Sequence, residues 1–412
     1  MSTPADRLPD PPLLTQFPLS VAMRRLAPGD ARATSEQRAA YLRRYTRLGD
    51  PEADAVVAMV QRLPTGTGHQ LVETALEYGI DAVPDPPEEL RALISQVDDV
   101  PYWVDGDQLD LACRVIGRTG LVGVTALAML ALCGGYLASR PAHTLACTGE
   151  LEHRAPRRLA DTMAWWTEVT TPGGMQRFGA GTKSTVRVRL THAMVRAGLS
   201  RRPDWDYTTW DSPLNQSQLC GTILLFPLAQ LTGSQACGIH FTPDERQAVY
   251  ALWRYVGYLL GVRSELLPAS ERDAWRMWWL QADYEFRTPS EDSRRLAQAL
   301  IHALGPTMTG PGTSRLHHLR RSCTTDILCA YARLLLGDHH ADLLGLPNQK
   351  LAQATVIAAA TAITTLEIPR RLLPGATHWC EIVGRRSQRA AANRMITKSK
   401  RKSGSTVVDT TR

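Results

Sequence analysis

Apolar residues recur at spacings of three and four along most of this 412-residue chain, and this pattern constrains its fold more than any other feature. Such spacing places side chains on one face of an α-helix, whereas a strand needs strict alternation. Alternation is rare here, and the stretch Val186-Arg187-Val188-Arg189 leads directly into a helical pattern. The sequence therefore predicts an all-α fold. The expected helices span residues 30–50, 88–97, 108–118, 158–169, 185–199, 243–260 and 292–303, with one more beginning at Pro51.

Composition and cysteine spacing are those of a globular protein, and we expect one large helical domain. Apolar residues make up 44% of the chain and charged residues 21%, which is ordinary globular usage and excludes a disordered or collagen-like protein. The eight cysteines include no Cys-x-x-Cys pair, which excludes a zinc ribbon and a thioredoxin-type motif. We expect an irregular segment over residues 1–29, a helical domain over 30–384, and a basic, disordered tail over 385–412.

The net charge of +7 belongs to that tail. Residues 385–412 hold nine Lys or Arg and one acid, so the rest of the chain carries a net charge of −1. A basic end without aromatic side chains is typically solvated. We therefore expect no specific nucleic-acid partner and at most weak contact between the tail and anionic surfaces.

One uncharged segment and the N-terminus are relevant to whether the protein spans a membrane or is exported. Residues 121–138 form a run of eighteen without a charge, but a membrane span needs about twenty apolar residues, and this run contains Gly134, Gly135 and Tyr136. We expect a helix buried on all sides there, and no membrane span.

The first nineteen residues mix Asp, Arg and five prolines without an apolar signal region, so we expect a cytoplasmic protein.

Common catalytic signatures are absent from the sequence. It has no His-Glu-x-x-His, no Gly-x-Ser-x-Gly and no Gly-x-Gly-x-x-Gly. The adjacent pairs His317-His318 and His339-His340 would point about 100° apart on a helix, so neither predicts a shared metal face.

One group of polar residues stands out on a mostly apolar helix. Arg189, His192 and Arg196 are spaced at i, i+3 and i+7, which places them on one helix face. Two flanking arginines lower the proton affinity of a histidine, and neutral imidazole is the form that ligates iron or zinc. The arginines would then suit an anionic cofactor edge such as haem propionates. On spacing alone, a satisfied core histidine between two surface arginines is the favoured explanation of the pattern.

An ordered set of short segments resembles the latex-clearing protein (rubber oxygenase) family and its wider superfamily of MpaB-type oxygenases. The set covers much of residues 85–350. Its members are VPYWVD at 100–105, RRLADT at 157–162, VRLTHAMVR at 188–196, PLNQ at 213–216, Gly221-Thr222, WRYVGYLLGV at 253–262 and LLGLP at 343–347.

This resemblance implies a globin-like helical core that binds haem b, with iron ligated by His192. It also implies that Arg158 and Thr162 line the opposite side of the haem. The rubber-cleaving branch carries a lysine directly before that threonine, whereas this chain has Asp161 there. A carboxylate beside bound oxygen would alter distal polarity and with it the reaction.

The resemblance therefore implies a haem-dependent oxygenase that uses dioxygen on a small, apolar, unsaturated substrate, by cleavage of a carbon–carbon double bond. The candidate site residues are Arg158, Asp161 and Thr162 for catalysis, and His192, Arg189 and Arg196 for the cofactor. Weaker candidates are Glu150 and Glu152 as proton-abstracting bases, and Trp165, Trp166 and Phe178 as cavity walls. A haem peroxidase or sensor, and a noncatalytic helical protein, are the alternatives.

Overall fold

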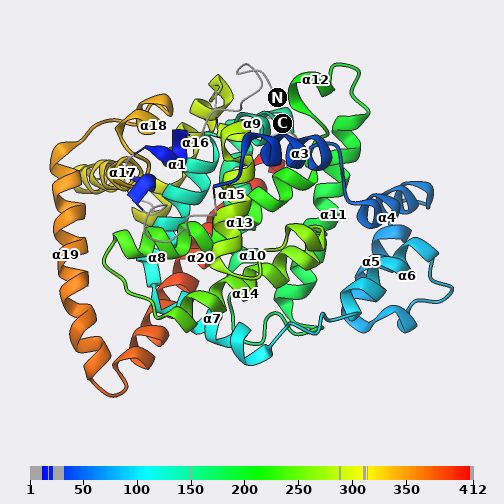
Figure 1. The fold of residues 1–412 in the computed structure, drawn as a ribbon, viewed down its shortest axis with the longest axis horizontal. Coiled ribbons are helices and arrows are strands. Elements are labelled where there is room, and N and C mark those ends of the chain that lie inside the picture. The colour runs from blue at the N-terminus through cyan, green and yellow to red at the C-terminus, as the bar shows by residue number, and fades with distance from the viewer. Residues whose placement is uncertain are drawn as a thin grey trace.

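The computed structural model describes residues 12–16, 18–21, 32–148, 151–286, 289–309, 312 and 314–408. Within these residues the regular elements are helices and no strand forms, which confirms the all-α prediction (Figure 1). The longer helices are α3 (Ser35–Tyr45), α4 (Pro51–Arg62), α5 (Thr67–Tyr78), α6 (Glu88–Asp98), α7 (Gly106–Arg118), α9 (Ser139–Cys147), α10 (Leu151–Val169), α11 (Ala180–Ser200), α13 (Gln216–Ala236), α14 (Pro243–Leu259), α15 (Glu271–Phe286), α16 (Glu291–Thr309), α17 (Arg315–Leu336), α19 (Lys350–Leu372) and α20 (Ala376–Val408). Shorter elements are α1 (Pro12–Thr15), α8 (Gly120–Ala126), η4 (Leu127–Cys133), α12 (Tyr207–Trp210), α18 (Asp338–Leu343) and two 3₁₀ turns, Ile80–Ala82 and Ser264–Leu266.

Helix starts follow local capping chemistry. The Thr34 hydroxyl accepts a hydrogen bond from the Gln37 N–H at 3.2 Å, and the Gln37 side chain accepts from the Thr34 N–H at 3.0 Å. This capping box begins α3 at Ser35, so the helix expected over 30–50 is shorter than predicted. Asp30 lies outside the described residues. The predicted start at Pro51 is confirmed, with Asp50 as the N-cap of α4.

One hydrophobic core connects most of the molecule, from Leu14 to Met395. α7 packs along α14, and α20 packs along both α7 and α10. Figure 1 shows α4, α5 and α6 at one edge of the molecule and α19 at the opposite edge. α11 packs against both α4 and α10, so it joins the α4–α6 edge to the body. The candidate site lies on this helix.

The C-terminal residues differ from the expected disordered tail. They continue as helix α20, in which Gln388 donates to the carbonyls of Ile116 at 2.9 Å and Gly120 at 3.1 Å. Arg385 donates to the carbonyls of Thr170 and Cys113. Further buried apolar side chains, such as Met395, fix this helix to α7 and α10. The expectation of disorder was wrong here because the basic residues occupy one part of a helix whose other side chains enter the core.

The uncharged run at 121–138 is not the uniform buried helix that we expected. It forms α8 and the π-helical η4, and Leu121 is exposed. The chain bends by 94° between α7 and the α8–η4 segment, just before this run. Among the described residues, one helix is long and apolar enough to cross a membrane, and it is α19, with 11% of its apolar window buried. Most of the segment 1–29 lies outside the described residues.

Candidate functional site

His192 lies in the middle of α11 and is half-buried. Its Nδ1 atom is buried and has no hydrogen-bond partner among the described residues. Burial lowers the pKa of this imidazole to about 4, with Arg196 adding to the effect and Asp50 opposing it. A histidine with this pKa is neutral at physiological pH, which is the form that ligates a metal. The predicted protonation state is therefore supported, although its main cause is burial and the arginine is secondary.

Arg189 is held by the N-terminal end of α4. Its Nε and Nη2 atoms donate to the two carboxylate oxygens of Asp50 at 2.6 and 2.7 Å, and Nη1 donates to Gln96 at 2.9 Å. Asp50 also accepts from the Ala53 N–H as the helix N-cap. Because Arg189 and Asp50 are both almost fully buried, this two-pronged ion pair is a fixed part of the core.

Arg196 makes a second ion pair one helical step further along α4. It donates to Asp54 at 2.7 and 2.9 Å, and to the carbonyl of Leu214 at 3.0 Å. The backbone of Leu214 has a φ of 49°, an unusual value for a branched residue. The guanidinium thus stabilises a strained turn that leads into α13.

Gln216 connects the same region to the end of α14. Its amide donates to the carbonyls of Gly49 and Gly261, both at 2.9 Å, and its oxygen accepts from the Arg263 N–H at 3.0 Å. Gly261 has a φ of +77°, and a Cβ there would lie 2.3 Å from an Asp50 oxygen. The sequence segments at 188–196, 213–216 and 253–262 therefore meet in one polar network, which we call the α4 network.

The α4 network changes the interpretation of the two arginines. We expected Arg189 and Arg196 to face the anionic edge of a cofactor. Their guanidinium groups instead have carboxylate partners within the protein, so this geometry gives no support to that role. Their positions are explained by the attachment of α4 to α11.

A tryptophan and a threonine connect α11 to α10. The Trp165 indole N–H donates to the Thr185 hydroxyl at 3.0 Å, which sets the antiparallel register between α10 and α11. Arg158 precedes Trp165 by seven residues, and His192 follows Thr185 by seven, or about two helical turns in each case. Continuing the register places Arg158 level with His192, and both lie on the helix faces that carry the Trp165–Thr185 contact.

Arg158 is a half-buried cation without a carboxylate partner among the described residues. Burial lowers the pKa of its guanidinium, and Tyr136 opposes this shift. A guanidinium without a carboxylate partner is suited to a group that brings its own negative charge or partial charge. The haem-facing role of Arg158 stays a prediction.

The other two predicted catalytic residues are exposed. Thr162 lies one turn beyond Arg158 on α10, at the surface. The Asp161 side chain is 74% exposed and forms an ion pair with Arg157 at 3.9 Å. Such a pair is an ordinary feature of a helix surface. The structure therefore brings Arg158 and His192 to one level but leaves Asp161 on the outside.

The weaker candidates divide in the same way. Trp165 and Trp166 are buried, and Trp165 packs edge-on against Phe226 and Trp253. Phe178 is 52% exposed under the Arg177 guanidinium, so its prediction as a cavity wall is wrong. Glu150 and the side chain of Glu152 lie outside the described residues.

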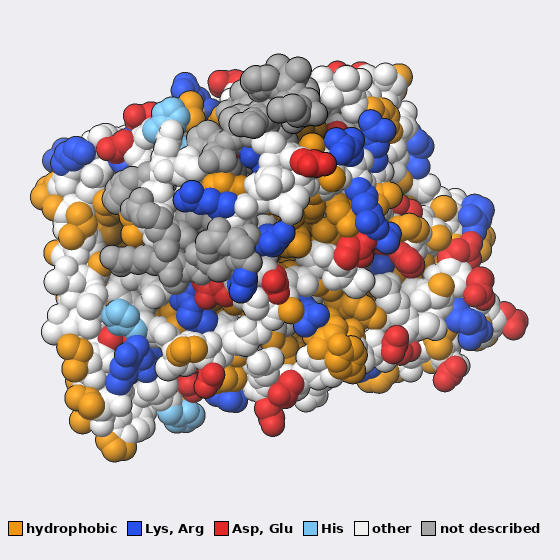
Figure 2. Space-filling model, viewed as in Figure 1, with side chains coloured by type: hydrophobic (Ala, Val, Ile, Leu, Met, Phe, Trp, Pro, Cys, Tyr) orange, Lys and Arg blue, Asp and Glu red, His pale blue; other side chains and the backbone are white. Residues whose placement is uncertain are grey.

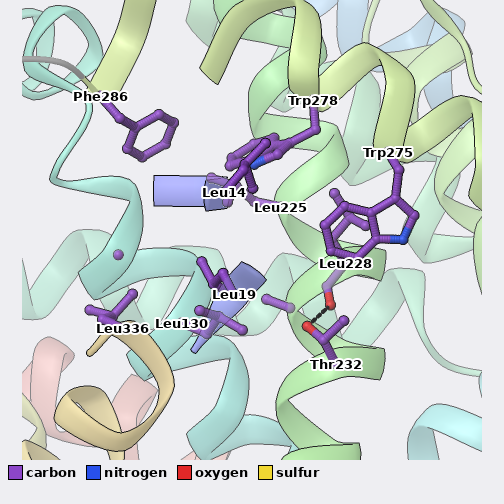
Figure 3. A pocket seen from close by; sticks show the side chains of 12 residues that line it. Leu14, Leu19, Leu130, Leu225, Leu228, Thr232, Trp275, Trp278, Phe286 and Leu336 are labelled. Carbon is purple, nitrogen blue, oxygen red and sulfur yellow. Dashed lines mark hydrogen bonds between the residues drawn. The ribbon is translucent and has the colours of Figure 1, made fainter. Parts of the chain in front are cut away.

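An apolar pocket with a cavity volume of about 40 Å³ lies between α13, α15 and η4 (Figure 3). Leu225, Leu228, Trp275 and Trp278 are among the side chains that line it. None of the predicted site residues does so. Along α13, Leu225 follows Gln216 by nine residues, roughly 14 Å of helix, so the pocket and the α4 network lie at different levels of one helix.

Sequence patterns did not single out Glu285 on α15. Both of its carboxyl oxygens are buried without a hydrogen-bond partner among the described residues. Burial raises the pKa of Glu285 to about 7, with Asp211 adding to the shift and Arg140 opposing it. In the sequence, Glu285 lies between Tyr284 and Phe286 near the end of a mostly apolar helix. That position is the one sequence feature that could have indicated a buried glutamate.

The helical body, with a neutral imidazole level with an uncompensated arginine, defines an all-α protein with a candidate cofactor site. Residues 118–365 match the family described as "ER-bound oxygenase mpaB/B'/Rubber oxygenase, catalytic domain". This match covers more than half of the chain, and the chain belongs to that family. The resemblance drawn from the sequence segments is thereby confirmed.

Two known proteins are similar to this chain. The rubber oxygenase of Streptomyces sp. (strain K30) is 21% identical over 283 residues, which cover 66% of this chain and 64% of that relative. The alignment therefore spans slightly less than two thirds of the relative. The solved structure of latex clearing protein LCP in the closed state superposes with a TM-score of 0.61 at 19% identity, covering 84% of this chain and 90% of that one. This second likeness supports the shared helical fold.

Proposed function

We propose that this protein is a haem b-dependent oxygenase that acts with dioxygen on a small, apolar, unsaturated substrate, by oxidative cleavage of a carbon–carbon double bond. The observation that carries the proposal is the position of His192 level with Arg158 in a chain of an oxygenase family, with no carboxylate partner for Arg158 and no hydrogen-bond partner for His192 Nδ1 among the described residues. The α4 network gives the rest of the motif a structural role and leaves these two side chains available.

His192 fits the proposed axial ligand because its imidazole is neutral and its ring is held on a long, well-anchored helix. When bound, the haem supplies the binding and activation of dioxygen. Arg189 and Arg196 hold α11 on either side of the histidine by their ion pairs with Asp50 and Asp54. They therefore fix where the imidazole lies without contacting the cofactor.

Arg158 has five N–H donors and a fixed positive charge. Level with His192, it is placed to donate hydrogen bonds to an anionic or partly negative group held beside the imidazole. Its half-buried position strengthens such an interaction, because the local dielectric is lower than that of water. Thr162 lies one turn along the same helix, where its side chain is exposed.

The proposed class of substrate rests on the match to the rubber oxygenase family. The apolar pocket between α13, α15 and η4 has none of the proposed site residues in its lining.

The cofactor proposal is tested by titrating the purified protein with haemin and recording the visible spectrum. We expect a Soret band and a b-type pyridine haemochrome near one haem per chain, and complete loss of this binding in His192→Ala. His240→Ala is the matched control, because His240 makes its contacts to Glu367 and Arg118 through the backbone. A wild-type protein that stays colourless, or equal loss in both variants, would contradict the proposal.

The reaction is tested on haem-loaded protein with a short polyprenyl alcohol and labelled dioxygen. We expect oxygen consumption and carbonyl products that carry the label. Haem binding without substrate-dependent oxygen consumption would favour a sensor, and turnover with peroxide in its place would favour a peroxidase.

A further inference from the structure

The hairpin between α19 and α20 exposes large apolar side chains. We call residues 366–383 the hairpin tip. Figures 1 and 2 show this part of the molecule at the lower left, with apolar side chains along its edge. Five large apolar side chains in it are 60% exposed or more: Leu366 (66%), Ile368 (63%), Leu372 (75%), Leu373 (60%) and Trp379 (64%). Isolated exposed apolar residues are normal, but a group of this size on one projection marks an interaction surface.

The hairpin tip is firmly attached to the body. α19 packs along α17, and Val356 is buried. Glu367 is buried as well, accepts from the His240 N–H at 3.1 Å and pairs with Arg370 at 2.8 Å. A helix held by a buried carboxylate on the protein side is not free to cross a bilayer, although its length and composition pass that test. The tip is therefore a rigid projection.

The exposed charges around the hairpin tip are of one sign. Arg371, Arg386, Arg389 and Arg394 are exposed on the last turn of α19 and along α20. The acids between residues 366 and 397 are Glu367, which is buried, and Glu381, which is half-buried. An apolar projection with exposed arginines next to it complements an anionic lipid surface.

We propose that the hairpin tip docks this protein on the surface of anionic membranes. Leu372 and Leu373, at the turn, enter the boundary between headgroups and acyl chains, and Trp379 lies at the headgroup level. Arg371 and Arg386, the exposed arginines next to the turn, contact lipid phosphates. A second copy of the chain fits this surface less well, because a two-fold contact through the tip would bring the same arginines of both copies together. The tip follows the residues that match the oxygenase family, and docking is independent of the proposed haem site.

The proposal is tested by flotation of the full chain with two kinds of vesicle, phosphatidylcholine alone and an equal mixture of phosphatidylcholine and phosphatidylglycerol. We expect binding to the anionic vesicles that weakens as salt is raised. Leu372→Asp/Leu373→Asp should lower the bound fraction at least about tenfold. Leu316→Asp/Leu319→Asp is the matched control, since these leucines of α17 are 57% and 61% exposed and also lie beside arginines.

Several outcomes would overturn the docking proposal. These are an absence of binding to either vesicle, equal loss of binding in the tip and control variants, and a concentration-dependent dimer in sedimentation that the tip variant abolishes. Circular dichroism and haemin titration of both variants check that each is folded. Because haem binding is measured separately, a colourless protein that still floats would defeat the proposed function and leave membrane docking intact.

Discussion

Two groups of polar residues around one face of α11 show how the same kind of residue serves different ends. Arg189 and Arg196 each pair with a carboxylate of α4 or its N-cap at 2.6 to 2.9 Å. His192, which lies between them on α11, and Arg158 on α10 have no such partner among the described residues. A buried charge with its counter-charge is satisfied and holds the fold, whereas a buried polar group without one is available for a ligand. The comparison separates the residues that build the site from those proposed to use it.

The largest effect on stability is expected from Asp50→Ala, on the α4 side. This change leaves the guanidinium of Arg189 buried without its carboxylate and removes the N-cap of α4. Breaking a buried ion pair by removing one partner costs about 3–5 kcal/mol of unfolding free energy. Urea denaturation measures the loss. Asp161→Ala, which breaks an exposed pair, is the control and should change the value by less than about 1 kcal/mol. Equal effects would show that the α4 network does not hold the fold.

On the α10 side, Arg158→Gln should reduce activity and leave stability intact. The variant removes a positive charge that has no protein partner, so its unfolding free energy should equal or exceed that of the wild type. Removing a donor that stabilises developing charge typically lowers kcat by about 100-fold. Steady-state oxygen consumption, with haem content measured in parallel, gives the answer. Arg157→Gln, at the neighbouring exposed position, should have normal activity. A destabilised but fully active Arg158→Gln protein would contradict the distinction between arginines that hold the fold and the arginine proposed for the site.

Glu285 tests whether burial without a partner lowers stability. Because its folded pKa is raised to about 7, its unfolded form ionises first as pH rises, and the folded state holds the extra proton. Glu285 therefore contributes stability at acidic pH that is lost as pH rises through 7. Between pH 5 and pH 8 the loss is about 2 kcal/mol, and Glu285→Gln should remove this dependence. Urea denaturation of both proteins across that range measures it. Parallel pH profiles for the two would show that Glu285 does not titrate as described.

Much of the fold and part of the site could be predicted from residue spacing. The starts of α4, α6 and α14 lie where proline, acidic residues and caps placed them, because capping depends on neighbours within one turn. The i, i+3, i+7 spacing correctly placed Arg189, His192 and Arg196 together. Composition was misleading for α20, since a basic stretch can carry Gln388 and Met395 into the core at helical spacing.

What the sequence determined by itself was local: helical periodicity, helix starts, and the likeness of ordered segments to an oxygenase family. Only the tertiary structure decided what each charged residue contacts. Arg189 finds Asp50 at a separation of 139 residues, and Arg196 finds Asp54 at 142. No local rule specifies such partners, because they depend on how helices pack. The same packing leaves Arg158 and His192 level with each other and without a charged partner among the described residues, and that is why they are the proposed site.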